Sequence, residues 1–257
     1  MKKPFCNLFV IAAILVSLCG SASAEQAEKD WYVSLRMALQ PYTTEMSGKI
    51  GHREFDAKAD LSDIMDNTDT TLLGGEVEFG KGRWFTFLSG TYQDTEAEHG
   101  DTTHGSKVNF TEKSLNMMVG YRVLKQDLGD GRTFSLDAMG GGFYVDVKNE
   151  VNIYNPVLGN ISHSESISFL DPMVGARMYY PFTKKFGAQI FGEIGGLIFG
   201  SEMHFVADAR LVYNFTERFI LSAGYKYWYW RWEDDGARLN ELEQKVYGPV
   251  LGLEFKF

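Results

Sequence analysis

Tyr247-Gly-Pro-Val-Leu-Gly-Leu-Glu-Phe-Lys-Phe257, the last eleven residues of the sequence, alternate between large apolar side chains and small or polar ones. In an extended strand, successive side chains point to opposite faces, so the two kinds separate. The apolar face carries Tyr247, Pro249, Leu251, Leu253, Phe255 and Phe257. The opposite face carries Gly248, Gly252, Glu254 and Lys256, together with Val250. This pattern predicts a β-strand with one apolar face, and an aromatic side chain such as that of Phe257 suits a membrane interface.

The same alternation recurs along the whole sequence. Ten segments share it, at residues 32–40, 73–79, 85–91, 115–123, 134–138, 170–180, 188–194, 205–215, 219–227 and 247–257. The mean hydropathy is −0.20, and hydropathy alone indicates a soluble protein. Transmembrane β-strands escape that test, because alternation dilutes their apolar signal. The repeated pattern therefore predicts an all-β fold of strands that each have one apolar face.

The connections between these segments alternate in length. The short ones are residues 80–83, 125–131, 183–185 and 214–218; the longer ones are 43–69, 94–107, 148–166 and 233–244, and 200–203 is a short member of that second set. Transmembrane barrels have short turns at one end and longer loops at the other. We therefore predict a transmembrane up-and-down antiparallel β-barrel of about ten strands. Twelve strands are the alternative, if the connection 43–69 supplies two more.

Aromatic residues give a second indication, because a transmembrane barrel carries aromatic girdles at both interfaces. Near the short connections lie Phe79, Phe85, Tyr121, Phe134, Tyr180, Phe182, Phe186, Tyr213, Phe215, Phe219, Phe255 and Phe257. Near the long ones lie Tyr42, Tyr144, Phe205, Tyr227, Tyr229 and Tyr247. A soluble β-sandwich or lipocalin-like barrel also alternates, but it has no reason to carry aromatic side chains at both ends.

Residues 1–24 have the features of a secretory signal peptide. Two lysines precede the apolar run 8–18, which is too short to span a membrane, and Ala22-Ser23-Ala24 is a small-residue cleavage site. We expect residues 25–257 to form the mature barrel domain. Both cysteines leave with the signal, and the net charge changes from −9 to −11, with 23 basic and 34 acidic residues. Nucleic acid is not expected as a partner of such an acidic chain.

The C-terminal strand resembles the assembly signal of Gram-negative outer-membrane barrels. Gly252, Phe255 and Phe257 fit that signal, whereas Val250 stands where it usually carries a polar residue. The resemblance implies that the barrel-assembly machinery binds the strand ending at Phe257. It also implies outer-membrane lipids and lipopolysaccharide as partners.

Three further segments are similar to a family of uncharacterised bacterial outer-membrane β-barrel proteins, which are porin-like. They are residues 61–67 (Leu-Ser-Asp-Ile-Met-Asp-Asn), 81–84 (Lys-Gly-Arg-Trp) and 170–177 (Leu-Asp-Pro-Met-Val-Gly-Ala-Arg). The similarity extends over most of the mature chain. It implies a porin-like barrel in the bacterial cell outer membrane and supplies no activity or catalytic residue.

If the apolar faces contact lipid, the alternate positions line the interior. A charged set falls there, namely Arg36, Glu76, Glu78, Arg122, Asp137, Asp171, Arg177, Glu193, Asp208, Arg210, Lys226 and Glu254. About eight strands enclose only side chains, whereas 16 to 18 leave an aqueous channel, so a ten-stranded interior is narrow. Charges of both signs can pair across it. An ion-paired core is therefore favoured over a pore-lining selectivity ring.

Trp228, Trp230 and Trp232 continue the interior face of the segment 219–227 towards a long connection. Three indoles at a barrel mouth suit a stacking platform for a sugar or an apolar ligand. The favoured alternative is that they pack against a plug segment. A register shift would instead turn them to the membrane interface.

The first long connection contains the segment that could form such a plug. Leu61, Ile64 and Met65 recur at helical spacing, with Asp63 between them, and residues 55–61 before them alternate as a short strand does. We expect a hairpin followed by a short helix that folds into or over the barrel mouth.

No catalytic residue, metal site or cofactor is predicted. The His-Ser-Glu triplet at 163–165 resembles a hydrolase trio only in composition, because neighbours in a strand point to opposite faces. His99, Asp101 and His104 lie in a loop without a helix to fix metal-ligand spacing. We expect a passive or structural role, namely limited small-solute passage, surface ligand binding or envelope integrity. An outer-membrane barrel enzyme that hydrolyses lipid or peptide is the alternative.

Overall fold

The computed structural model describes residues 31–40, 42–50, 53–59, 68–100, 105–155, 159–196, 200–233 and 239–257. In chain order its strands are β1 (Trp31–Leu39), β2 (Thr43–Ile50), β3 (Arg53–Ala59), β4 (Thr68–Lys81), β5 (Trp84–Gly100), β6 (Gly105–Gly129), β7 (Arg132–Asn155), β8 (Gly159–Pro181), β9 (Phe186–Gly195), β10 (Met203–Asn214), β11 (Phe219–Glu233) and β12 (Leu239–Lys256). Within these residues, no helix has the length and apolar character needed to cross a membrane. The predicted signal peptide lies outside the described part of the chain.

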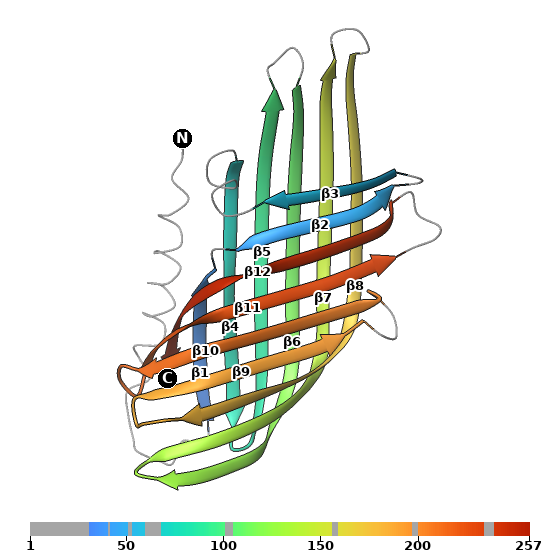
Figure 1. Cartoon of the computed structure of the whole chain (residues 1–257). Helices are drawn as coiled ribbons and strands as arrows, with labels where there is room; N and C mark the ends of the chain where they lie inside the picture. Colours follow the sequence, from blue (N-terminus) through green and yellow to red (C-terminus); the bar gives the residue numbers. More distant parts are fainter. Residues whose placement is uncertain are drawn as a thin grey trace.

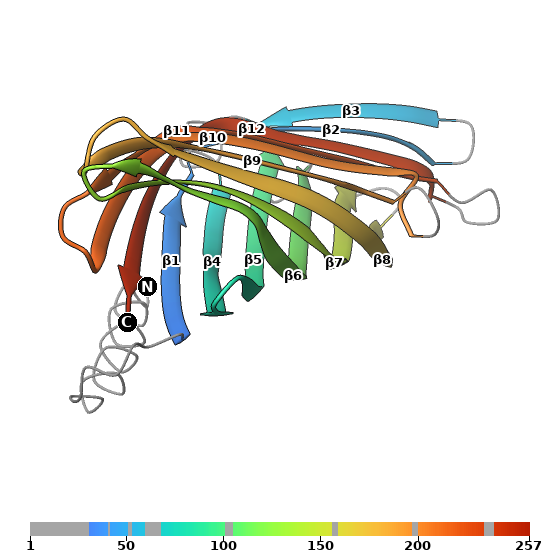
Figure 2. The same cartoon turned by 90° about the horizontal axis from the view of Figure 1, so that it is seen from below.

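Ten of these strands, β1 and β4 to β12, form a closed antiparallel barrel (Figures 1 and 2). Each strand from β4 to β11 pairs with the next one along the chain, and β1 closes the ring by pairing with both β4 and β12. At this closure Val33 lies opposite Phe79, and Met37 lies opposite Leu253. The predicted all-β barrel of ten strands is confirmed.

Strands β2 and β3 form an extra hairpin outside this ring of ten. β2 pairs with β12 between Leu239 and Tyr247, beyond the part of β12 that pairs with β1. Among the described strands, β3 pairs with β2 alone, so a twelve-stranded ring does not form. The segment predicted to plug the barrel, with Leu61, Asp63, Ile64 and Met65, lies outside the described residues.

The two ends of the barrel differ. Tight turns join β4 to β5, β6 to β7, β8 to β9 and β10 to β11; we call this the turn end and the opposite one the loop end. The β6–β7 turn contains Asp130 (φ 54°) and Gly131 (φ 73°), because a two-residue hairpin turn needs left-handed backbone at both positions. Strands β5 to β8 have 17, 25, 24 and 23 residues, against 10 in β9. They extend past the other barrel strands at the loop end (Figure 1).

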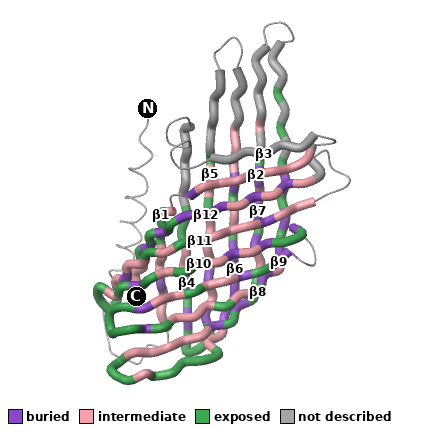
Figure 3. The backbone as a smooth tube through the Cα atoms, viewed as in Figure 1, coloured by how far each residue is buried: buried purple, intermediate pink, exposed green. Residues whose placement is uncertain are grey.

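The outward face of the barrel is apolar between its two ends. Large exposed side chains there include Met117, Val119, Leu170, Val174, Ile190, Leu211, Leu251 and Leu253. Along many strands, buried and more exposed residues alternate, as Figure 3 shows. A water-soluble protein rarely exposes so extensive an apolar surface, and a band of this kind is what a transmembrane barrel presents to lipid.

Three aromatic side chains differ from the sequence interpretation. Phe85 and Phe87 are only 3% and 8% exposed and face the interior, where the Arg177 guanidinium lies 4.8 Å from the centre of the Phe85 ring. Tyr42 is buried as well. The assignment of Phe85 and Tyr42 to the aromatic girdles is therefore wrong. Trp84, the neighbour of Phe85, is exposed instead, so β5 begins with aromatic residues on both faces and alternation could not separate them.

Candidate functional site in the barrel interior

The interior of the barrel is filled in two layers. The charged layer lies nearer the turn end and includes Tyr32, Arg36, Glu76, Glu78, Arg122, Asp137, Arg177 and Glu254. The aromatic layer lies nearer the loop end and includes Phe143, Val145, Phe169, Trp228, Trp230 and Leu242. Both layers consist of every second residue of the barrel strands, and the residues between them face outward. The same alternation therefore forms the interior and the outer surface.

Arg36 of β1 connects three carboxylates in the charged layer. Its Nη1 donates to Glu78 Oε2 at 3.0 Å and also to Glu76, while its Nε lies 3.1 Å from Glu254 Oε2. Ser34 Oγ donates to the other oxygen of Glu254 at 2.7 Å. These contacts join β1 to its two neighbours, β4 and β12, and so reinforce the closure of the ring.

Arg177 of β8 carries the network across the interior. Its Nη1 donates to Glu78 Oε2 of β4 at 2.6 Å, and its Nη2 donates to Asp137 Oδ2 of β7 at 2.9 Å. Arg122 of β6 donates to the other Asp137 oxygen at 2.9 Å, and the Tyr32 hydroxyl donates to Glu78 at 2.6 Å. Since β4 and β8 are not neighbours in the sheet, the Arg177–Glu78 contact bridges the lumen.

The other predicted interior charges form smaller groups. Arg210 donates to Asp208 on its own strand, and Lys226 lies opposite Asp208 in the β10–β11 register. Glu193 accepts two hydrogen bonds from the amide of Asn116, at 3.1 and 3.2 Å. The structure thus connects Arg36, Arg122 and Arg177 through shared carboxylates. The two smaller groups lie beside that network, within electrostatic reach of Glu76.

Trp228, Trp230 and Trp232 point into the aromatic layer and not to solvent. Trp230 is fully buried, and its ring centre lies 5.4 Å from that of Phe169 in β8; the Trp228 ring lies 5.8 Å from Phe143 in β7. Strands β9 to β12 run across β4 to β8 at a steep angle (Figures 1 and 2), so opposite walls of the barrel meet at these rings. Sequence reasoning did not identify Phe143 and Phe169 as partners, because it could not show which strands face each other.

His204 is a buried residue that sequence reasoning missed. Its Nε2 accepts a hydrogen bond from the Trp228 indole at 2.9 Å, and its Nδ1 lies 3.4 Å from Asp171 Oδ2. Asp171 also accepts from the backbone NH and the hydroxyl of Ser201, at 2.7 and 2.6 Å. His204, Asp171 and Ser201 do not form a catalytic triad, because the serine bonds the aspartate and both ring nitrogens already face other groups. The sequence could have predicted that His204 faces inward, because it alternates in phase with Asp208 along β10.

The other histidines considered above cannot be placed in this way. The side chains of His99, His104 and His163 lie outside those that the structure describes. Among the side chains that it does describe, no group of three or more His, Cys, Asp or Glu residues could hold a metal ion.

Glu112 is a second buried group that sequence reasoning missed. It points from β6 into the aromatic layer, is 3% exposed, and shares a hydrogen bond with Gln244 of β12. It lies on the loop side of Leu115 and Tyr144, beyond the apolar band. Burial raises the pKa of the Glu112 carboxyl from 4.5 to about 7, although the hydrogen bond with Gln244 acts to lower it.

The stability of the barrel should therefore depend on pH through Glu112. A raised carboxyl pKa in the folded state contributes stability that is fully present below pH 4.5 and is lost as the pH rises to about 7. The loss is on the order of 3 kcal/mol, which corresponds to the difference between a pKa of 4.5 and one of about 7. Urea unfolding at pH 4.5 to 8 should show this decline in the native chain and a flatter profile in Glu112→Gln. Parallel profiles for the two chains would contradict this assignment.

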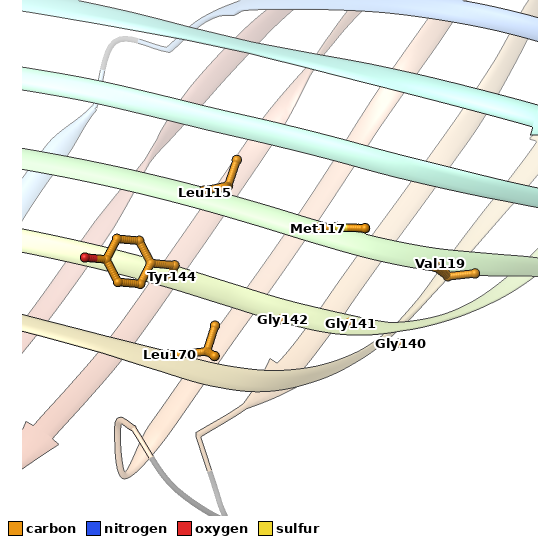
Figure 4. Close-up of a pocket in the computed structure, with 8 residues that line it drawn as sticks. All are labelled: Leu115, Met117, Val119, Gly140, Gly141, Gly142, Tyr144 and Leu170. Carbon is orange, nitrogen blue, oxygen red and sulfur yellow. The ribbon is translucent and has the colours of Figure 1, made fainter.

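On the outward face, three consecutive glycines form the floor of an apolar furrow of about 330 Å³ (Figure 4). The furrow is lined by Leu115, Met117, Val119, Gly140, Gly141, Gly142, Tyr144 and Leu170. Gly141 is required for backbone reasons, because a Cβ there would lie 2.0 Å from the Met117 carbonyl oxygen of β6. The lining carries no acid, base or nucleophile in a position to react, so the furrow is a contact surface for apolar groups.

No protein-family model matches this sequence, and no curated protein is detectably similar to it. Among solved structures, the outer membrane protease OmpT from Escherichia coli is similar with a TM-score of 0.51 and 9% identity, over 92% of this chain and 99% of that one. OprG from Pseudomonas aeruginosa matches with a TM-score of 0.36 and 9% identity, over 88% of this chain and 95% of that one. Neisserial surface protein A matches with a TM-score of 0.35 and 13% identity, over 90% of this chain and all of that one.

The Escherichia coli protein is an outer membrane protease, and its likeness to this chain confirms, at the level of the fold, the resemblance drawn from the sequence. At 9% identity, the likeness to the Escherichia coli barrel extends to the fold alone.

Proposed function

We propose that this protein is a barrel of the bacterial outer membrane whose interior is closed to free solute flow, and whose role is structural or surface binding. Its outward apolar band and its fold support the location. Lipid and lipopolysaccharide would then surround the barrel, and the last strand, with the exposed ring of Phe257 at its end, would contact the assembly machinery.

The proposal of a closed interior depends on one observation, that opposite walls of the barrel are in contact in both layers. In the charged layer Arg177 of β8 bonds Glu78 of β4, and in the aromatic layer Trp230 of β11 packs on Phe169 of β8. A solute that crossed the whole barrel would have to break desolvated ion pairs near the turn end and also displace close-packed rings. Of the roles expected from the sequence, small-solute passage is therefore the one that the geometry supports least.

The long strands β5 to β8 support a role at the cell surface. They project past the other barrel strands at the loop end (Figure 1), where a transmembrane barrel carries its external loops. A rigid closed barrel would hold these two hairpins in a fixed position above the membrane. We propose that this projecting sheet is where a surface ligand would bind.

Planar-bilayer recording tests the closed interior. Refolded native protein is expected to insert without discrete conductance steps, while a general porin measured in parallel gives them. Insertion must be shown independently, by heat-dependent electrophoretic mobility and by recovery in the outer-membrane fraction. Regular conductance steps from inserted native protein would overturn the proposal, and recovery in the soluble periplasmic fraction would overturn the location.

A further inference from the structure

The aromatic layer contains polar atoms that the rest of the interior leaves without partners. Glu112 Oε2, Gln244 Oε1, Trp230 Nε1 and Thr44 Oγ1 are all buried, and none of them makes a hydrogen bond. The residues Glu112, Gln244 and Trp230 are each at least 97% buried. Buried polar groups are normally paired, because each unpaired one costs about 1 to 3 kcal/mol. His204 Nδ1 is a fifth unpaired atom among the described residues of this layer, beside Phe143. The first four indicate a role beyond packing.

These four atoms belong to residues that gather around Gln244. Glu112 reaches it across the lumen from β6, and Trp230 lies directly opposite it in the β11–β12 register. Thr44 lies opposite Val246, the next interior residue of β12 after Gln244. Three elements, β6, β11 and the β12–β2 pair, thus place these polar residues beside or across the lumen from Gln244.

The chemistry of these atoms selects the ligand. Three of them, on Glu112, Gln244 and Thr44, can accept hydrogen bonds, and the Trp230 indole can only donate one. Glu112 carries the only ionisable carboxyl of the four residues, and its one described hydrogen-bond partner is the neutral Gln244. Trp230 lies opposite Gln244 and packs with Phe169 and Trp228 in one buried cluster, and aromatic faces attract cations. An acceptor-rich, anionic and aromatic site suits a protonated amine.

We propose that the interior at Glu112 binds a small soluble amine that also carries a hydrogen-bond acceptor, such as an amino alcohol. The ammonium group donates to Glu112, Gln244 and Thr44, and the ligand's acceptor atom receives the Trp230 NH. Binding needs the ionised carboxylate, so affinity rises as the pH passes through about 7. Among the described groups, Tyr42 lies within electrostatic reach of Glu112, and an ordinary tyrosine stays neutral in this range. This inference rests on the described interior and not on the membrane location.

Ethanolamine hydrochloride is the probe, with ethylene glycol as the neutral control and sodium chloride as the ionic control. Fluorescence reports binding, because Trp228, Trp230 and Trp232 lie at the site; replacing Trp31 and Trp84 by phenylalanine removes the two outward-facing indoles. Ethanolamine should give a saturable change at pH 8 that is at least tenfold weaker at pH 5.5. Neither control compound should reproduce it.

Two variants and one matched control test the assignment. Glu112→Gln should weaken ethanolamine binding by tenfold or more, and Trp230→Phe, which removes the NH but keeps a ring, should weaken it severalfold. Glu243→Gln changes a carboxylate one residue from Gln244 that pairs with Lys245, and it should bind as the native chain does. A native chain without a saturable response, or a Glu112→Gln chain that binds normally, overturns the proposal. A folded Trp230→Phe chain with native affinity overturns the role of the indole NH.

Discussion

Replacing Arg177 with alanine is expected to lower the free energy of barrel unfolding by about 3 to 5 kcal/mol, because two buried carboxylates each lose one of their two arginine partners. Glu78 and Asp137, which Arg177 bridges, are 2% and 1% exposed. Neither carboxylate could recover its lost hydrogen bonds from bulk water without opening the interior. Urea unfolding of the refolded barrel in detergent, followed by tryptophan fluorescence, measures the loss.

Arg231→Ala is the matched control for this prediction. Arg231 also faces several carboxylates, with Glu241 at 3.1 Å and Glu202 at 3.6 Å, but its side chain is 38% exposed. Exposed ion pairs contribute about 0 to 1 kcal/mol, because water screens them and can replace the lost contacts. Equal losses in the two variants would show that the charged layer is not the main electrostatic support of the barrel.

Replacing Trp230 with alanine is expected to cost about 3 to 5 kcal/mol as well, here through lost packing and the cavity left behind. Trp230 is fully buried between β8 and β12, and no neighbour can fill the volume of an indole without moving a strand. The same change removes a cross-lumen contact of the aromatic layer. We therefore expect Trp230→Ala to destabilise the barrel and to make brief conductance events more frequent.

Trp84→Ala controls for the general effect of removing an indole. Trp84 is 60% exposed on the outward face, and its main described ring partner is Tyr121, 4.8 Å away. Its loss should cost less than that of Trp230 and leave the conductance unchanged. If Trp230→Ala had the same urea midpoint of unfolding as the native chain, the contact between the two walls would not be what stabilises the aromatic layer.

The two layers explain how a ten-stranded barrel can have a closed interior. A round ring of this size leaves room that side chains must fill, and here opposite walls approach each other closely enough for Phe169 to meet Trp230. Charges fill the remaining space near the turn end, where Arg177 spans the lumen. The hairpin β2–β3 then continues the sheet from β12 at the loop end.

The sequence alone was sufficient for the fold and for which residues face inward along most strands. The alternation of apolar and polar residues shows which face of a strand meets an apolar environment. In the last strand it predicted that Leu251 and Leu253 face outward, and both side chains are exposed on the barrel. The alternation failed where both faces of a strand are apolar, as at Phe85 in β5, because a period of two residues cannot then distinguish the inward face from the outward one.

Which interior residues touch was decided by the tertiary structure alone. Contacts across the lumen, such as Arg177 with Glu78 or Glu112 with Gln244, join strands that are far apart in both the sequence and the sheet. They depend on how far the ring is flattened and how strongly its strands tilt, and a one-dimensional pattern of period two contains neither quantity. The sequence therefore determined the barrel and its two faces, while the packing of opposite walls determined which of the described polar groups are paired and which are not.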